Sequence, residues 1–144
     1  MSPAELYDRD FYEWTLRNAE LLRSGRTSEA DLDHIAEEIE DMGKRERREL
    51  VSRLGVLIGH LLKWQAQPDR RSRSWEATIR LQREEISDLL AEMPSLRPDL
   101  ETNLLKAYRH GVIAASTETH LPVEDFPSTS PFSLDVLLDP NFLP

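Results

Sequence analysis

The 144-residue sequence contains no cysteine, which excludes disulfides, thiolate catalysis, iron–sulfur clusters and cysteine-type zinc sites. It has no apolar run of about 18 residues, so we expect no membrane-spanning helix. The first residues lack a basic start followed by an apolar stretch, so we expect no signal peptide and a cytoplasmic location. Phosphate-loop, dinucleotide-binding, nucleophile-elbow and HExxH zinc motifs are all missing. We therefore assign no catalytic residue, no metal ligand and no cofactor.

The chain also has no overall excess of basic residues: its formal net charge is -9. This charge argues against a protein that coats DNA, which would be basic. The charges are distributed unevenly along the chain. Residues 1–43 carry 4 basic and 12 acidic side chains, residues 44–83 carry 11 and 4, and residues 84–144 carry 3 and 11. A basic central block therefore lies between two acidic ones.

Helical spacing of apolar residues dominates residues 8–119, and no segment alternates with the period of a strand. The first apolar stripe ends at Gly25. The second predicts one long helix over about 29–66, opened by a capping box of Ser28 and Asp31 and either straight or bent at Gly43. The pairs Glu40–Lys44 and Asp41–Arg45 would support it across the glycine. Its apolar stripe keeps one phase throughout, at Leu32, Ile39, Leu50, Leu54, Leu57 and Leu61.

Pro68 ends this helix and Asp69 is expected to cap a third, which Pro94 ends. Ser95 is expected to cap a fourth, whose small residues around Gly111 permit a close approach to another helix. The last 24 residues, 121–144, hold five of the nine prolines. The predicted fold class is all-α: an antiparallel bundle of four main helices in one domain, 1–144. Residues 1–120 would form the bundle and 121–144 an irregular proline-rich C-terminal strap.

Arginines in the opening turn of the third helix oppose its dipole, at about 0.3–1 kcal/mol each. Carboxylates of the same chain or of a second copy would offset this cost, and residues 28–41 supply many. A phosphate-type anion bound by N–H groups, guanidinium groups and hydroxyls would also offset it. Plain solvation is the third possibility. The candidate anion-binding residues are Arg70, Arg71, Ser72, Arg73, Ser74 and Trp75.

Three polar residues fall on inward-facing helix positions: His60, Gln82 and Glu118. Because buried polar groups need partners, we predict a core polar network that contains them, with Arg80 or Arg83 near Glu118. A general base or ligand role for His60 is the alternative to a structural one. The spacing of His34 with nearby carboxylates resembles a metal site, but these residues lie opposite the apolar stripe. They are expected to face solvent or a charged neighbour.

Several segments together resemble the DUF29 family of uncharacterised bacterial proteins. They include Leu6-Tyr7-Asp8, Phe11 to Trp14, the run from Asp33 to Gly43, His60 to Trp64, Arg71 to Ile79, Pro94 to Leu96, Glu118-Thr119 and the closing Phe142-Leu143-Pro144. The resemblance covers almost the whole chain and implies a compact all-α fold. It brings no known activity, cofactor or catalytic residue.

The sequence leaves three functional hypotheses. The first, which we favour, is a non-enzymatic helical module that self-associates as a homo-oligomer or binds a protein partner. The second is binding of a phosphate-containing ligand or single-stranded nucleic acid at the Arg70–Trp75 turn, where arginine beside an aromatic suits phosphate and base. The net charge disfavours nucleic acid. The third is an enzyme that uses His60 with a core carboxylate.

Overall fold

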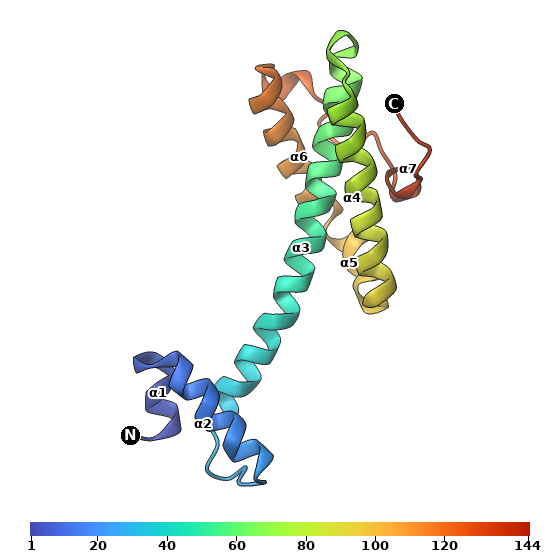
Figure 1. Cartoon of the computed structure of the whole chain (residues 1–144). Coiled ribbons are helices and arrows are strands. Elements are labelled where there is room, and N and C mark those ends of the chain that lie inside the picture. The colour runs from blue at the N-terminus through green and yellow to red at the C-terminus, as the bar shows by residue number, and fades with distance from the viewer. The chain divides into compact units, whose positions relative to one another are not determined.

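A computed structural model describes all 144 residues and is all-α, which confirms the predicted fold class. Its α-helices are α1 (Pro3–Arg9), α2 (Phe11–Arg23), α3 (Leu32–Ala66), α4 (Arg73–Glu92), α5 (Arg97–Thr102), α6 (Leu104–Thr119) and α7 (Leu134–Leu138) (Figure 1). Short 3-10 helices occupy Pro68–Arg70, Pro94–Leu96 and Val123–Asp125. No helix is both long and apolar enough to cross a lipid bilayer. The antiparallel four-helix arrangement stays a prediction.

The chain divides into two compact units, Met1–Arg45 and Glu46–Pro144. Helix α3 begins in the first unit and ends in the second. Each unit is described by itself below. The expectation of one domain stays a prediction.

In the first unit, α1 and α2 are separate helices because the backbone of Asp10 is not helical, with φ -151° and ψ 85°. Its backbone N–H donates to Leu6 O at the end of α1. Its carboxylate then accepts from Glu13 N at 3.1 Å and caps α2. Helix α2 ends before Gly25, whose φ of 76° is the left-handed conformation that favours glycine. This C-terminus was predicted and is confirmed.

Helix α3 runs through Gly43 without a break, as one helix of 35 residues. It begins at Leu32 rather than near residue 29, so the predicted capping box at Ser28 is wrong. Turns occupy this stretch instead, with Glu29 N donating to Arg26 O and Ala30 N donating to Thr27 O. These local hydrogen bonds satisfy the backbone groups that an extra helical turn would use.

In the second unit, Ser72 rather than Asp69 caps α4, and its hydroxyl accepts from Trp75 N at 3.1 Å. Asp69 lies within a 3-10 helix that Pro68 starts. The predicted fourth helix is divided into α5 and α6 at Asn103. The Asn103 amide donates to Asp99 O at 2.9 Å and satisfies a carbonyl near the end of α5.

One hydrophobic cluster forms the core of the second unit, from α3, α4, α6 and the C-terminal tail. Leu50, Leu54 and Leu57 of α3 are fully buried in it. In Figure 1, α4 runs beside this part of α3. Helix α6 approaches so closely that a Cβ on Gly111 would lie 2.8 Å from Ile58 Cγ2. The predicted close approach of small residues is confirmed.

The C-terminal tail packs on this core through Phe126, Phe132 and Leu137, which are buried. The Tyr108 hydroxyl donates to Pro127 O. The Arg83 guanidinium donates to the carbonyls of Leu137 at 2.8 Å and Phe142 at 2.7 Å. Polar as well as apolar contacts therefore hold the tail.

Candidate interaction surface

A polar cluster in the first unit joins α1 and α2 to the start of α3. Trp14 Nε1 and His34 Nδ1 both donate to the Asp31 carboxylate, at 2.9 and 2.6 Å. The Tyr7 ring stacks on the His34 ring, with centroids 3.8 Å apart, and its hydroxyl donates to Glu38. These bonds use the face of α3 that carries His34 and Glu38. The histidine and carboxylates whose spacing resembles a metal site therefore take part in structural hydrogen bonds.

The cluster shifts the pKa values of its members. The bond to Glu38 raises the pKa of Tyr7 to about 12. The hydrogen bond to Asp31 raises the pKa of His34. Burial opposes ionisation of Asp31, but the hydrogen bonds from Trp14 and His34 outweigh it and lower the pKa of Asp31. The ionised carboxylate and the protonated imidazole therefore stabilise each other.

A different face of α3 is apolar and uncovered in the first unit. Leu32, Ile39 and Met42 are 50%, 63% and 60% exposed. They continue the stripe that is buried at Leu50 and Leu57 in the second unit. Because large apolar side chains are ordinarily covered when they share one helix face, this face is the strongest candidate for binding another helix. We call Leu32, Ile39 and Met42 the α3 apolar face.

Charged residues surround this face and have no partner along the helix. The predicted pairs Glu40–Lys44 and Asp41–Arg45 are not formed: the ion pairs of the first unit are Arg26–Glu29 and His34–Asp31. The side chains of Glu40, Lys44 and Arg45 are exposed. They are therefore available to groups outside the chain.

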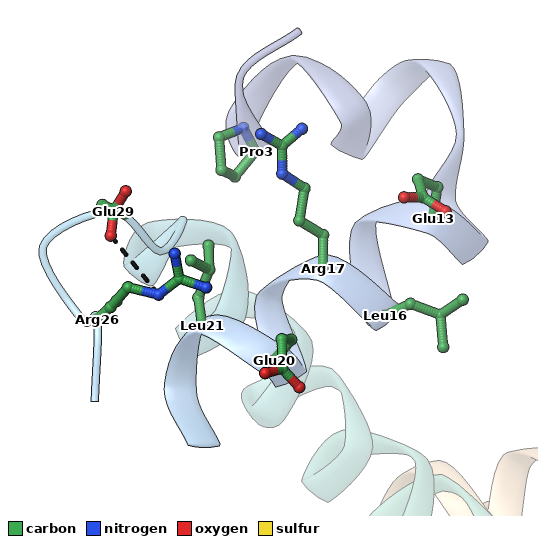
Figure 2. Close-up of a pocket in the computed structure, with 8 residues that line it drawn as sticks. All are labelled: Pro3, Glu13, Leu16, Arg17, Glu20, Leu21, Arg26 and Glu29. Carbon is green, nitrogen blue, oxygen red and sulfur yellow. Dashed lines mark ion pairs between the residues drawn. The ribbon is translucent and has the colours of Figure 1, made fainter. Parts of the chain in front are cut away.

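The first unit also has an open pocket of about 540 Å³, lined from α1, α2 and the following turn. Figure 2 shows Arg17 and Arg26 among its lining residues, together with Glu13, Glu20 and Glu29. Arg26 pairs with Glu29 at 3.8 Å, and Arg17 donates to Met1 O at 2.8 Å. The mixed charges leave no field of one sign, so this pocket does not favour a charged ligand.

The predicted anion site lies at a turn where several groups already have partners. Arg71 Nε donates to Trp64 O at 2.8 Å, and its guanidinium stacks on the Trp64 ring. The Ser72 hydroxyl caps α4, and Lys63 Nζ lies 4.8 Å from the centroid of the Trp75 ring. Arg70, Arg73 and Ser74 are exposed, and neither arginine pairs with a carboxylate of its own unit. Anion binding here stays a prediction.

The predicted core polar residues have separate partners. The Glu118 carboxylate pairs with Lys63, whose side chain is buried. Gln82 Oε1 accepts from Arg53 Nη1 at 3.3 Å. His60 Nδ1 donates to Val56 O at 3.0 Å, and burial lowers the pKa of His60. His60 and Glu118 both lie in the field of Lys63, but no hydrogen bond joins them, and a joint network or catalytic role stays a prediction.

Sequence reasoning did not identify the structural roles of two residues, Lys63 and Arg83. Lys63, rather than Arg80 or Arg83, pairs with Glu118. Arg83 is only 6% exposed and holds the C-terminal tail instead. The signal was present, because Arg83 occupies a helix position between the buried Ile79 and Ile86. A cation on an apolar stripe indicates that acceptors must meet it inside the core.

An apolar groove of about 630 Å³ lies between α6 and the tail of the second unit. Exposed Leu105, Ile113 and Val123 line it, with Phe126 at its base. No charge pattern beside this groove selects an occupant. No group of three or more potential metal-ligating side chains is arranged to hold a metal ion.

The architecture defines an all-α protein in which the α3 apolar face is uncovered in the first unit. Residues 6–143 match the family described as "Domain of unknown function DUF29", and the chain belongs to that family. This confirms the resemblance found in the sequence. No curated protein and no solved structure matches the chain.

Proposed function

We propose that this chain is a helical protein-interaction module, rather than an enzyme, that acts in the cytoplasm. It binds another helix through the α3 apolar face. The observation that carries the proposal is the exposure of Ile39 and Met42, 63% and 60%, on a stripe that is fully buried at Leu50 and Leu57. A helix with apolar residues at this spacing would bury the face and gain about 25 cal/mol per Å² of apolar surface covered.

Photo-crosslinking tests the proposal. A photoreactive phenylalanine analogue would replace Ile39 in one variant and Lys44 in a matched control, in cells that express the chain. Lys44 follows Ile39 by five residues, about 500° around the helix, and so projects well away from the α3 apolar face. We expect a defined protein adduct at position 39 and none at position 44.

The protein in the adduct must then be identified, and the crosslink must form again with the purified partner and the purified chain. Met42→Lys should abolish it in both settings, while the free energy of unfolding changes by less than about 0.5 kcal/mol because the side chain is exposed. Absence of any adduct at position 39, or equal adducts at both positions, would contradict the proposal.

A further inference from the structure

The charges around the α3 apolar face reverse sign between Met42 and Gly43. Before this point the charged residues are carboxylates: Glu37, Glu38, Glu40 and Asp41. After it four cations, Lys44, Arg45, Arg47 and Arg48, outnumber two carboxylates, Glu46 and Glu49. All of these residues lie on α3, so the pitch of one helix sets their pattern. A second α3 laid antiparallel places the acidic half against the basic half. A parallel copy in register places like charges together.

The charges that border the apolar face make this preference specific. At about 100° per residue, Glu40 and Arg47 project on one side of the line through Ile39, and Glu38 and Arg45 project on the other. Equivalent sides of two antiparallel helices face each other. Glu40 then meets Arg47 of the second copy. On the other side, Arg45 of the second copy approaches Glu38, whose carboxylate already accepts from the Tyr7 hydroxyl. In a parallel pair opposite sides meet, which brings Glu40 to Glu38 and Arg45 to Arg47.

Gly43 lies at the centre of this pattern, and no close contact within its own chain requires a glycine there. A Cβ at this position would meet no atom within 4 Å. Glycine inside a helix costs roughly 0.5–1 kcal/mol relative to alanine. Met42 and Gly43 project on opposite sides of the line through Ile39, so in an antiparallel pair centred here Gly43 of one copy lies beside Gly43 of the other. The missing side chain lets the two helix backbones approach.

We infer that the partner of the α3 apolar face is a second copy of this chain, bound antiparallel with its two-fold axis between Met42 and Gly43. The inference rests on the proposed function, because it names the occupant of the part of the same face that Ile39 and Met42 form. The apolar contact is small, so the dimer is weak and concentration-dependent. The flanking charges fix its orientation more than its affinity.

Charge exchange tests the contact. We expect sedimentation equilibrium of the wild type to show a monomer–dimer equilibrium across micromolar to millimolar concentrations. Arg47→Glu should raise the dissociation constant about tenfold, because two attractive pairs become repulsive. The double variant E40R/R47E should restore it. Lys44→Glu changes the net charge equally but projects away from the face, and should leave the dissociation constant within about twofold.

Disulfide trapping tests the orientation of the two helices. The chain has no native cysteine, so only the introduced cysteines can form a disulfide. Ile39 and Glu46 are opposite each other in the antiparallel pair, whereas two copies of either position are about 10.5 Å apart along the axis. Such a separation is too long for a disulfide. Mixed Ile39→Cys and Glu46→Cys chains should therefore form a heterodisulfide, and neither variant alone should form a homodisulfide.

The outcomes separate this inference from the proposed function. Homodisulfides of both variants, or no rescue by E40R/R47E, overturn the antiparallel pair. A wild type that remains monomeric at millimolar concentration also overturns it. A reconstituted adduct of position 39 with a different protein supports the proposed function and overturns the second copy as partner. Absence of any adduct at position 39 overturns the proposed function itself.

Discussion

Two histidines illustrate how single residues respond to their surroundings in opposite ways. His34 donates to an ionised Asp31, which raises its pKa. His60 is partly buried, and burial lowers its pKa. The same side chain is therefore stabilised as a cation in one unit and as a neutral ring in the other.

Stability should depend on pH with opposite signs at these two sites. The contribution of His34 is fully present below its unfolded pKa of about 6.5 and is lost as pH rises through its higher folded pKa. The contribution of His60 is lost at low pH and is recovered as pH rises from its folded pKa through 6.5 or so. Hydrogen exchange at a series of pH values, followed at amides of α2 for the first unit and of α4 and α6 for the second, measures both.

His34→Gln should remove the loss of stability as pH rises above about 6.5, and His60→Gln should remove the loss of stability as pH falls below about 6.5. Each variant is the control for the other. A His34→Gln curve that parallels the wild type at every pH would contradict the assigned contact with Asp31.

Arg83 provides a second prediction at the residue scale. Arg83→Met should lower the free energy of unfolding by at least about 2 kcal/mol, because buried carbonyls of the tail lose their donors. Arg80→Met on the exposed side of α4 should change it by less than about 0.5 kcal/mol. Urea unfolding checks the energies, and faster proteolysis of the tail in Arg83→Met checks the cause. Equal effects of the two variants would show that the tail does not depend on this guanidinium.

At the scale of elements, apolar spacing predicted most helices because it is a local property of the chain. The continuity of α3 and the end of α2 at Gly25 followed from it. The breaks at Asp10 and Asn103 did not, because each depends on a side chain that competes with helical hydrogen bonding by only about 1 kcal/mol. The α3 apolar face was visible as a stripe, but its exposure depends on tertiary packing.

Two glycines in helices should respond oppositely to alanine. Gly43→Ala should raise the free energy of unfolding of the monomer by about 0.5–1 kcal/mol, because nothing opposes the added methyl group. Gly111→Ala should lower it by about 1–3 kcal/mol, because the methyl group would overlap Ile58. Urea unfolding of both variants at low concentration measures the difference. A loss of stability in Gly43→Ala would contradict the open space around this position in the monomer.

At the scale of the whole molecule, the net charge of -9 conceals blocks of opposite sign, and the two units differ in how they are stabilised. The second unit contains the hydrophobic cluster. The first has few buried apolar residues, namely Leu6, Trp14 and Leu21, and relies on the polar cluster around Asp31. The sequence showed the charge blocks but not this division, because it depends on which residues become buried together.

The division predicts separable unfolding. Trp14→Ala should destabilise the first unit by about 3–5 kcal/mol, while amides of α4 and α6 keep their hydrogen-exchange protection. Leu57→Ala in the second unit is the reciprocal control, with an expected loss of about 2–5 kcal/mol there. If Trp14→Ala abolished protection in α4, the two units would unfold as one.

The bonds from Arg83 to the tail also set an order of events during synthesis. Arg83 and Phe142 are 59 positions apart, so the second unit lacks its last acceptors until residue 142 has been made. Until then a charged guanidinium on α4 must remain hydrated, and the apolar surface beside it stays open. The pairing of α3 with α4 involves shorter loops and should form first. The nascent second unit therefore passes through a state that exposes its core to chaperones and proteases.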